Sequence, residues 1–114
     1  MDRMEVENLI NNLEAEVNNG GFDQFFYNSA GDDTVGTIGA LERIGASAMA
    51  DIVRRAAAKF PGGMPPKDRF QRQEALQTVS PESDAFEELD GEFYGYPDDL
   101  SGLLAQYTGK RNDP

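Results

Sequence analysis

The sequence contains no cysteine and no histidine. Without cysteine there is no disulfide and no thiolate metal site. Without histidine the commonest general base, the commonest metal ligand and every Ser-His or Cys-His nucleophile pair are missing. Many carboxylates remain, but no sequence feature marks one pair of them as catalytic. We therefore expect a protein that is not an enzyme, holds no metal and needs no cofactor.

Basic residues are scarce as well. The chain of 114 residues has 10 Lys and Arg against 21 Asp and Glu, which gives a formal net charge of −11. That charge disfavours direct binding to nucleic acid or to an anionic membrane surface. No uncharged stretch approaches the roughly 20 residues that a membrane-spanning helix needs, and the start MDRMEVENLINN lacks the apolar region of a secretory signal. We expect a cytoplasmic protein.

The charges are unevenly distributed along the chain. Residues 1–33 carry eight acids and one base, residues 34–72 carry three acids and seven bases, and residues 73–109 carry nine acids and no base. Two acidic blocks thus enclose a mildly basic one. Such a pattern is typical either of a well-solvated surface or of a negative face that binds a basic partner.

Apolar residues recur at helical spacing along nearly the whole chain, and no segment shows the period-2 alternation of a strand. A first stripe runs from Val6 to Val17 and ends at Asn18–Gly21, after which Phe22, Phe25 and Phe26 start a second short helix. We predict an all-α fold: one compact domain over residues 1–114 with six or seven short helices. The further helices are expected after a cap at Asp32, Asp33 or Thr34, after a cap at Ser47, after Asp68, over 82–94 and after Asp98 or Asp99. Their inward residues are expected to include Val35, Ile38, Met49, Phe60, Phe70, Leu76, Phe86, Phe93 and Leu100.

The segment 82–94 carries the most regular group of acids. Asp84, Glu88 and Glu92 stand at i, i+4 and i+8, so one helix would align them on one side, with Glu87 beside them. Like charges at this spacing cost a few tenths of a kcal/mol per pair, and no base between Gln73 and Gly109 offsets the cost. The row resembles the phosphate spacing of duplex DNA in order of magnitude.

The basic middle block has a simpler interpretation. Asp51 and Arg55, and likewise Asp68 and Arg72, are four residues apart, which is ordinary support for a helix. The block then forms a partly neutralised helical surface. A contact patch for an acidic surface, including that of a second copy of the chain, is the alternative.

One stretch has a specific pattern: residues 18–31, NNGGFDQFFYNSAG. Together with LEAEV (13–17), ALERIGA (40–46) and DGEFYGYPDDLSGLLAQY (90–107), it resembles a family of small bacterial DNA-mimic proteins first known from Neisseria. The resemblance implies an all-α fold, a dimer, and an acidic surface that keeps a transcription factor from its operator. Because the block is aromatic and amide-rich, we expect its residues to be structural: Asn18, Asn19, Gly20, Gly21, Phe22, Gln24, Phe25, Phe26, Tyr27 and Asn28.

The leading hypothesis is therefore a competitive inhibitor. Its acidic surface would bind a basic DNA-binding protein and block the access of that protein to DNA, without direct contact to nucleic acid or membrane and with a homodimer as one possible state. The residues expected to form this surface are Asp84, Glu87, Glu88, Glu92, Asp98 and Asp99, supported by Glu7 and Glu14.

The alternative hypothesis places the site elsewhere. A regulatory or immunity-type binding module would use a pocket of amide and aromatic side chains around Gln24, Tyr27 and Asn28. Binding in such a pocket would depend little on salt, whereas binding to an acidic surface weakens steeply as salt is added.

Overall fold

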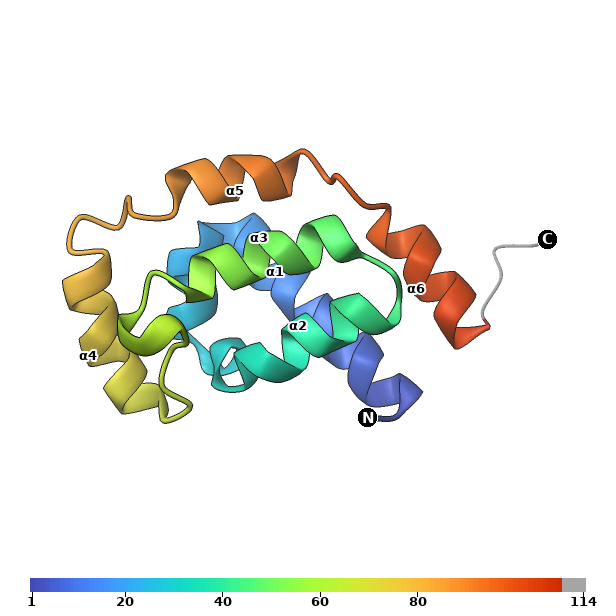
Figure 1. Ribbon diagram of the computed structural model, residues 1–114, viewed down its shortest axis with the longest axis horizontal. Helices are drawn as coiled ribbons and strands as arrows, with labels where there is room; N and C mark the ends of the chain where they lie inside the picture. The colour runs from blue at the N-terminus through green and yellow to red at the C-terminus, as the bar shows by residue number, and fades with distance from the viewer. Residues whose placement is uncertain (110–114) are drawn as a thin grey trace.

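The computed structural model describes residues 1–109, and over these residues it contains α-helices and short 3₁₀ helices but no strand (Figure 1). The all-α prediction is confirmed; the last five residues of the predicted domain lie outside the described part. The helices are α1 (Arg3–Tyr27), α2 (Thr34–Arg43), α3 (Ser47–Ala57), α4 (Arg69–Val79), α5 (Glu87–Tyr94) and α6 (Leu100–Thr108), with 3₁₀ helices at Ser29–Asp33 and Pro61–Gly63.

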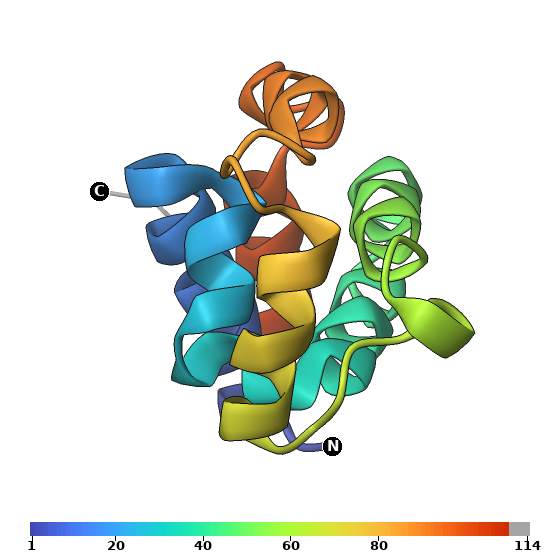
Figure 2. The ribbon, with the colours of Figure 1, turned by 90° about the vertical axis from the view of Figure 1, so that its left-hand side faces the viewer.

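The longest helix, α1, forms the centre of the fold. It packs against α2, α4, α5 and α6, while α3 packs against α2 and α5. Helix α4 lies at one end of the elongated molecule and α6 at the other, and α5 runs between them along one edge (Figures 1 and 2). The body measures 48 by 26 by 21 Å. None of its helices, over residues 1–109, is long and apolar enough to cross a membrane.

Helix α1 is broken at Gly20 and Gly21, the two glycines of the stretch NNGGFDQFFYNSAG at residues 18–31. Gly20 has φ −154° and ψ 20°, and Gly21 has φ 72° and ψ −172°, so neither backbone is helical. A positive φ of this size is easy for glycine and strained for other residues. The predicted break at 18–21 is therefore confirmed, although both helical segments count as one element.

The core is centred on phenylalanine. Phe22, Phe25 and Phe26 are fully buried as predicted, and they share a cluster with Phe60, Phe86 and Phe93. The ring of Phe26 lies 4.9 Å from that of Phe60 and 5.3 Å from that of Phe86, centroid to centroid, which is the range of favourable aromatic pairs. This cluster joins α1 to the segments before and within α5.

Two predicted core residues are exposed: Val35 at 56% and Phe70 at 69%. The prediction was wrong because neither side chain lies on the buried face of its helix. Helix α4 turns Arg72 and Leu76 inward, four residues apart on one side, and Phe70 is two residues before Arg72. Helix α2 buries Thr34, and Val35 follows it about 100° further around the axis.

Candidate functional site

Helix α5 begins at Glu87, five residues later than the sequence predicts. Ser83 has φ 55°, which interrupts a right-handed helix, and the hydroxyl of Ser80 accepts the backbone N–H of Ala85 at 3.2 Å. Asp84 therefore lies in the turn before α5. The predicted row of three carboxylates along one helix is wrong: only Glu88 and Glu92 share the helix.

Glu92 is held by a basic residue from α3. The two guanidinium nitrogens Nη1 and Nη2 of Arg55 donate to the carboxylate of Glu92 at 2.9 and 2.6 Å, and Nε donates to Asp51 at 2.9 Å. The bond to Arg55 lowers the pKa of the Glu92 carboxyl. Its negative charge is thus opposed by a positive one, and the predicted i, i+4 pair of Asp51 and Arg55 is confirmed.

Asp98 and Asp99 cap helices. Asp98 Oδ2 accepts the N–H of Met49 in the first turn of α3 at 2.8 Å, where the N-cap residue Ala46 offers no side-chain acceptor. Asp99 caps its own helix, α6, by accepting the N–H of Gly102 at 3.1 Å. These two carboxylates satisfy helix N-termini, which carry partial positive charge.

Glu7 and Glu14, the two supporting acids, lie apart from the others. They line a groove of about 390 Å³ between α1 and α6, together with Leu100 and Leu104. Burial raises the pKa of the Glu14 carboxyl. The structure does not bring this pair together with the acids of α5.

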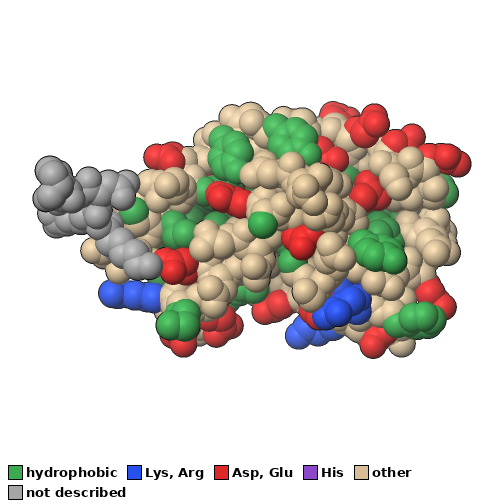
Figure 3. Space-filling view, turned by 180° about the vertical axis from the view of Figure 1, so that it is seen from behind, with side chains coloured by type: hydrophobic (Ala, Val, Ile, Leu, Met, Phe, Trp, Pro, Cys, Tyr) green, Lys and Arg blue, Asp and Glu red, His purple; other side chains and the backbone are tan. Residues whose placement is uncertain are grey.

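Three of the eight predicted carboxylates are exposed, close together in the chain and without an ion pair to any of residues 1–109: Asp84, Glu87 and Glu88. We call them the acidic edge. In Figure 3 the acidic side chains along the upper edge of the molecule have no basic side chain beside them, and further acidic side chains lie over the face and along the lower edge. The basic side chains visible in that view lie along the lower edge.

The sequence pattern gave no sign that Asp90, also in α5, has a structural role. Its Oδ1 accepts the N–H of Phe22 at 2.8 Å, so it caps the second segment of α1 from another helix. A Cβ on Gly21 would overlap the Asp90 carboxylate, which explains a glycine there beyond its positive φ. Burial raises the pKa of Asp90, the bond from Phe22 lowers it, and the carboxylates of Asp23 and Glu87 raise it further.

Further hydrogen bonds surround the same break in α1, and several of them come from amide side chains of residues 18–28. Tyr94 donates its hydroxyl to the carbonyl of Val17 at 2.8 Å, and Asn18 donates to the hydroxyl of Tyr96 at 2.9 Å. Gln24 donates to Glu16 and accepts from Asn19, at 2.8 and 3.0 Å. These bonds give the amide side chains a structural role around the bend in α1.

Arg72 was predicted to pair with Asp68 on the surface of a helix, and this is wrong. Asp68 instead caps α4 by accepting the N–H of Gln71 at 2.8 Å. Arg72 is fully buried, and its guanidinium reaches Asp32 at 2.6 Å and four backbone carbonyls. The available signal was its position four residues before Leu76, on the inward side of α4.

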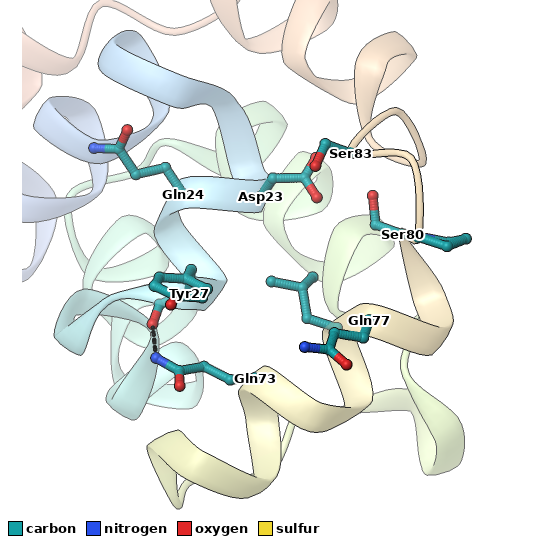
Figure 4. Close-up of a pocket in the computed structure, with 9 residues that line it drawn as sticks. Asp23, Gln24, Tyr27, Gln73, Gln77, Ser80 and Ser83 are labelled. Atoms are coloured by element: carbon teal, nitrogen blue, oxygen red, sulfur yellow. Dashed lines mark hydrogen bonds between the residues drawn. The ribbon is translucent and has the colours of Figure 1, made fainter.

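A pocket of about 600 Å³ lies between the second segment of α1 and helix α4 (Figure 4). Gln24 and Tyr27 line it as the alternative hypothesis requires, but Asn28 does not; the amide of Asn28 donates to Glu16 at 2.9 Å. In Figure 4 the amide of Gln24 points away from the other labelled side chains. The sequence pattern did not indicate the remaining lining residues, which are Asp23, Gln73, Leu76, Gln77, Ser80, Pro81 and Ser83.

No group of three or more His, Cys, Asp or Glu side chains within residues 1–109 is arranged to hold a metal ion. A search of curated proteins and a search of solved structures each found no match. A family model described as DMP19-like protein matches residues 8–112. This match covers nearly the whole sequence, and the chain therefore belongs to the DMP19-like protein family.

Proposed function

We propose that this protein is a DNA mimic that binds a basic DNA-binding protein and blocks the access of that protein to DNA. The observation that carries the proposal is the acidic edge: Asp84, Glu87 and Glu88 are exposed and unpaired among residues 1–109, in a block of sequence without a single base. Membership of the DMP19-like family supports it. The mechanism is competition, with no bond made or broken.

The other five carboxylates have a secondary part in this proposal. Three of them already accept hydrogen bonds within the fold: Glu92, Asp98 and Asp99. They contribute negative charge to the surface, but part of their capacity to accept hydrogen bonds is already used. Glu7 and Glu14, on the α1–α6 groove, would extend that field toward the far end of the molecule. A field of one sign accelerates encounter with a basic partner and weakens as salt is added.

Competition with DNA provides the test. The immobilised protein is exposed to lysate of its source cell at low salt, and bound proteins are eluted with duplex DNA or with buffer of the same ionic strength. We expect a DNA-binding protein that only the duplex releases. A DNA mimic and duplex DNA bind the same surface of the partner. Retention of the partner in the presence of excess duplex would therefore contradict the proposal.

Matched variants locate the surface. Glu87→Lys with Glu88→Lys should abolish retention of the partner, whereas Glu5→Lys with Glu74→Lys, which changes the charge by the same amount elsewhere on exposed positions, should leave most of it. Glu5 and Glu87 both stand in the first turn of a helix, so the effect on helix dipoles is similar. Circular dichroism checks that both variants keep their helices. Equal loss in both would mean that net charge alone is recognised.

A second candidate function is the regulatory binding module, because the pocket between α1 and α4 exists and Gln24 and Tyr27 line it. Its binding would persist at high salt and would be lost on Tyr27→Ala with the acidic edge intact. Repeating the capture experiment at high salt separates the two functions. A homodimer stays a prediction, which sedimentation of the protein would test.

A further inference from the structure

The pocket between α1 and α4 has one charged side chain in its wall. Asp23 is the only acid or base among the nine lining residues, and within residues 1–109 it forms no ion pair with a base. The neighbouring carboxylates of Asp84 and Asp90 are near enough to influence it or be influenced by it. The hollow is therefore a site of negative potential with no positive group of the described chain to neutralise it.

The pocket also has the acceptors and the aromatic surface that a planar cation needs. Figure 4 shows Asp23 beside Ser80 and Ser83 at one end, with Tyr27 and Gln77 at the other. The amide of Gln73 donates to the carbonyl of Tyr27 at 2.8 Å, which leaves its own oxygen as an acceptor. A guanidinium group has five N–H donors in a plane and stacks on aromatic rings, so it fits carboxylate, amide oxygens and Tyr27 better than an ammonium does.

The surroundings of the pocket point to a side chain of a protein and not to a free small molecule. Tyr27 is 56% exposed, and Phe70, 69% exposed, precedes Gln73 by three residues on the same side of α4. Exposed aromatic residues next to a pocket are typical of protein interfaces, where arginine is enriched in the partner. Ser83 in the pocket wall is followed directly by Asp84, so the pocket continues into the acidic edge.

We propose that the α1–α4 pocket receives the guanidinium group of one arginine side chain from the protein partner, with Asp23 as its carboxylate acceptor and Tyr27 as its aromatic wall. The source of the arginine rests on the proposed function: a basic partner that approaches the acidic edge presents arginines beside it. A volume of about 600 Å³ is within the range of ordinary ligand pockets and ample for one side chain. The acidic edge then attracts the partner, and the pocket fixes its position.

The test uses a probe that needs no partner. Nα-acetyl-arginine methylamide is titrated into the isotope-labelled protein, and backbone amide shifts are followed by NMR. We expect saturable shifts centred on Asp23, Tyr27 and Gln77. The citrulline analogue, which has the same shape without the charge, should bind roughly tenfold more weakly or worse, because a charge-assisted pair is lost.

Two variants and a control give the residue assignment. Asp23→Asn should weaken binding of the arginine probe about tenfold, and Tyr27→Leu, which keeps apolar volume but removes the ring, should weaken it severalfold. Glu5→Gln removes the same charge at an exposed position in the first turn of α1, outside the pocket wall, and should change binding less than twofold. Tyr27 is largely exposed, so its variant keeps the test valid if Asp23→Asn does not fold.

The proposal is overturned if the citrulline or lysine analogue binds as well as the arginine probe, if the shifts spread over Glu87 and Glu88 without preference for the pocket, or if Glu5→Gln weakens binding as much as Asp23→Asn. These outcomes are independent of the DNA-competition experiment. Arginine binding in the pocket without release of any protein by duplex DNA would remove the mimic function alone. The reverse result would remove the pocket assignment alone.

Discussion

Arg72 joins three segments through a single side chain. Its Nε donates to the carbonyl of Phe26 at 2.7 Å, and its terminal nitrogens donate to the carbonyls of Asn28, Pro66 and Lys67 at 2.9–3.0 Å and to Asp32 at 2.6 Å. All five N–H donors are therefore used. A buried guanidinium is tolerated only with such complete pairing. It fixes the end of α1 against the loop that leads into α4.

We expect Arg72→Met to lower the free energy of unfolding by about 3–5 kcal/mol, because four carbonyls and one carboxylate lose their donor inside the fold. Urea unfolding followed by circular dichroism measures the loss. Arg69→Met is the matched control: Arg69 binds the same Asp32 at 2.8 Å but is half exposed, so its loss should be far smaller. Similar losses in both variants would mean that the burial of Arg72 adds nothing.

Gly21 and Gly91 should respond in opposite ways to alanine. Gly21→Ala forces φ 72° on a residue with a Cβ and brings that atom against Asp90, so we expect a loss of about 1–3 kcal/mol. Gly91 lies inside α5 with no neighbour within 4 Å of an added Cβ, so Gly91→Ala should gain about 0.5–1 kcal/mol. Thermal unfolding of the two variants gives the comparison. A stabilised Gly21→Ala would contradict the strain argument.

At the scale of the helices, local signals predicted most boundaries. Asp68 caps α4 as expected, and among the expected candidates Asp33 caps α2 and Asp99 caps α6, since a side-chain acceptor before an apolar stripe acts within one turn. The expected cap of α3 at Ser47 is wrong: Ser47 is the first residue of that helix, and the N-cap is Ala46. The start of α5 could not be predicted this way. The turn at Ser83 depends on the burial of Phe86 among rings from α1 and on the bond from Ala85 to Ser80, which are tertiary and turn-specific effects.

The same distinction applies to the acids. The sequence places six of the eight predicted carboxylates in one block without bases, but which of them stay free of ion pairs and caps depends on partners far along the chain. Glu92 meets Arg55 from 37 residues away, and Asp98 meets Met49 from 49 residues away. No periodicity contains that information, because packing alone brings α3 beside α5 and the segment before α6. The pocket wall from α4 was missed for the same reason.

Substitution of Asp98 tests whether this acid, expected from the sequence to form part of the binding surface, stabilises helix α3. Because α3 has no side-chain cap of its own, Asp98→Ala should cost about 1 kcal/mol in the free energy of unfolding, whereas Asp98→Asn keeps an acceptor for Met49 and should cost clearly less. Chemical unfolding of both variants provides the measurement. An equal loss would indicate that the charge, and not the hydrogen bond, stabilises α3.

At the scale of the whole molecule, the carboxylates whose pKa is shifted by the fold have two opposite effects on the pH dependence of stability. The guanidinium groups of Arg69 and Arg72 lower the pKa of Asp32 to about 2 against partial burial that raises it, so its contribution is present above its unfolded value of 3.8 and is lost as the pH falls toward 2. Burial raises the pKa values of Glu14, Asp23 and Asp90, so the folded state takes up their protons first and gains stability as the pH falls.

We therefore expect the melting temperature to rise as the pH is lowered from 7 into the mildly acidic range and to fall again between about 4 and 2, where Asp32 takes up its proton in the unfolded chain before it does so in the folded protein. Relief of the repulsion within a molecule of net charge −11 acts in the same direction as the first step. Calorimetry between pH 2 and pH 8 records the profile. Asp32→Asn should remove much of the acid-side fall, and a steady decline from pH 7 downward would contradict the assignment of raised pKa values.

Helix α5 has only eight residues, yet three of its side chains are anchored to other segments: Asp90 to Phe22, Glu92 to Arg55 and Tyr94 to Val17. These anchors prevent the helix from rotating about its axis or sliding along α1. Glu87 and Glu88 therefore project from a base whose orientation is set before any partner arrives. A preorganised surface loses little conformational entropy on association, so a small number of carboxylates can support tight binding.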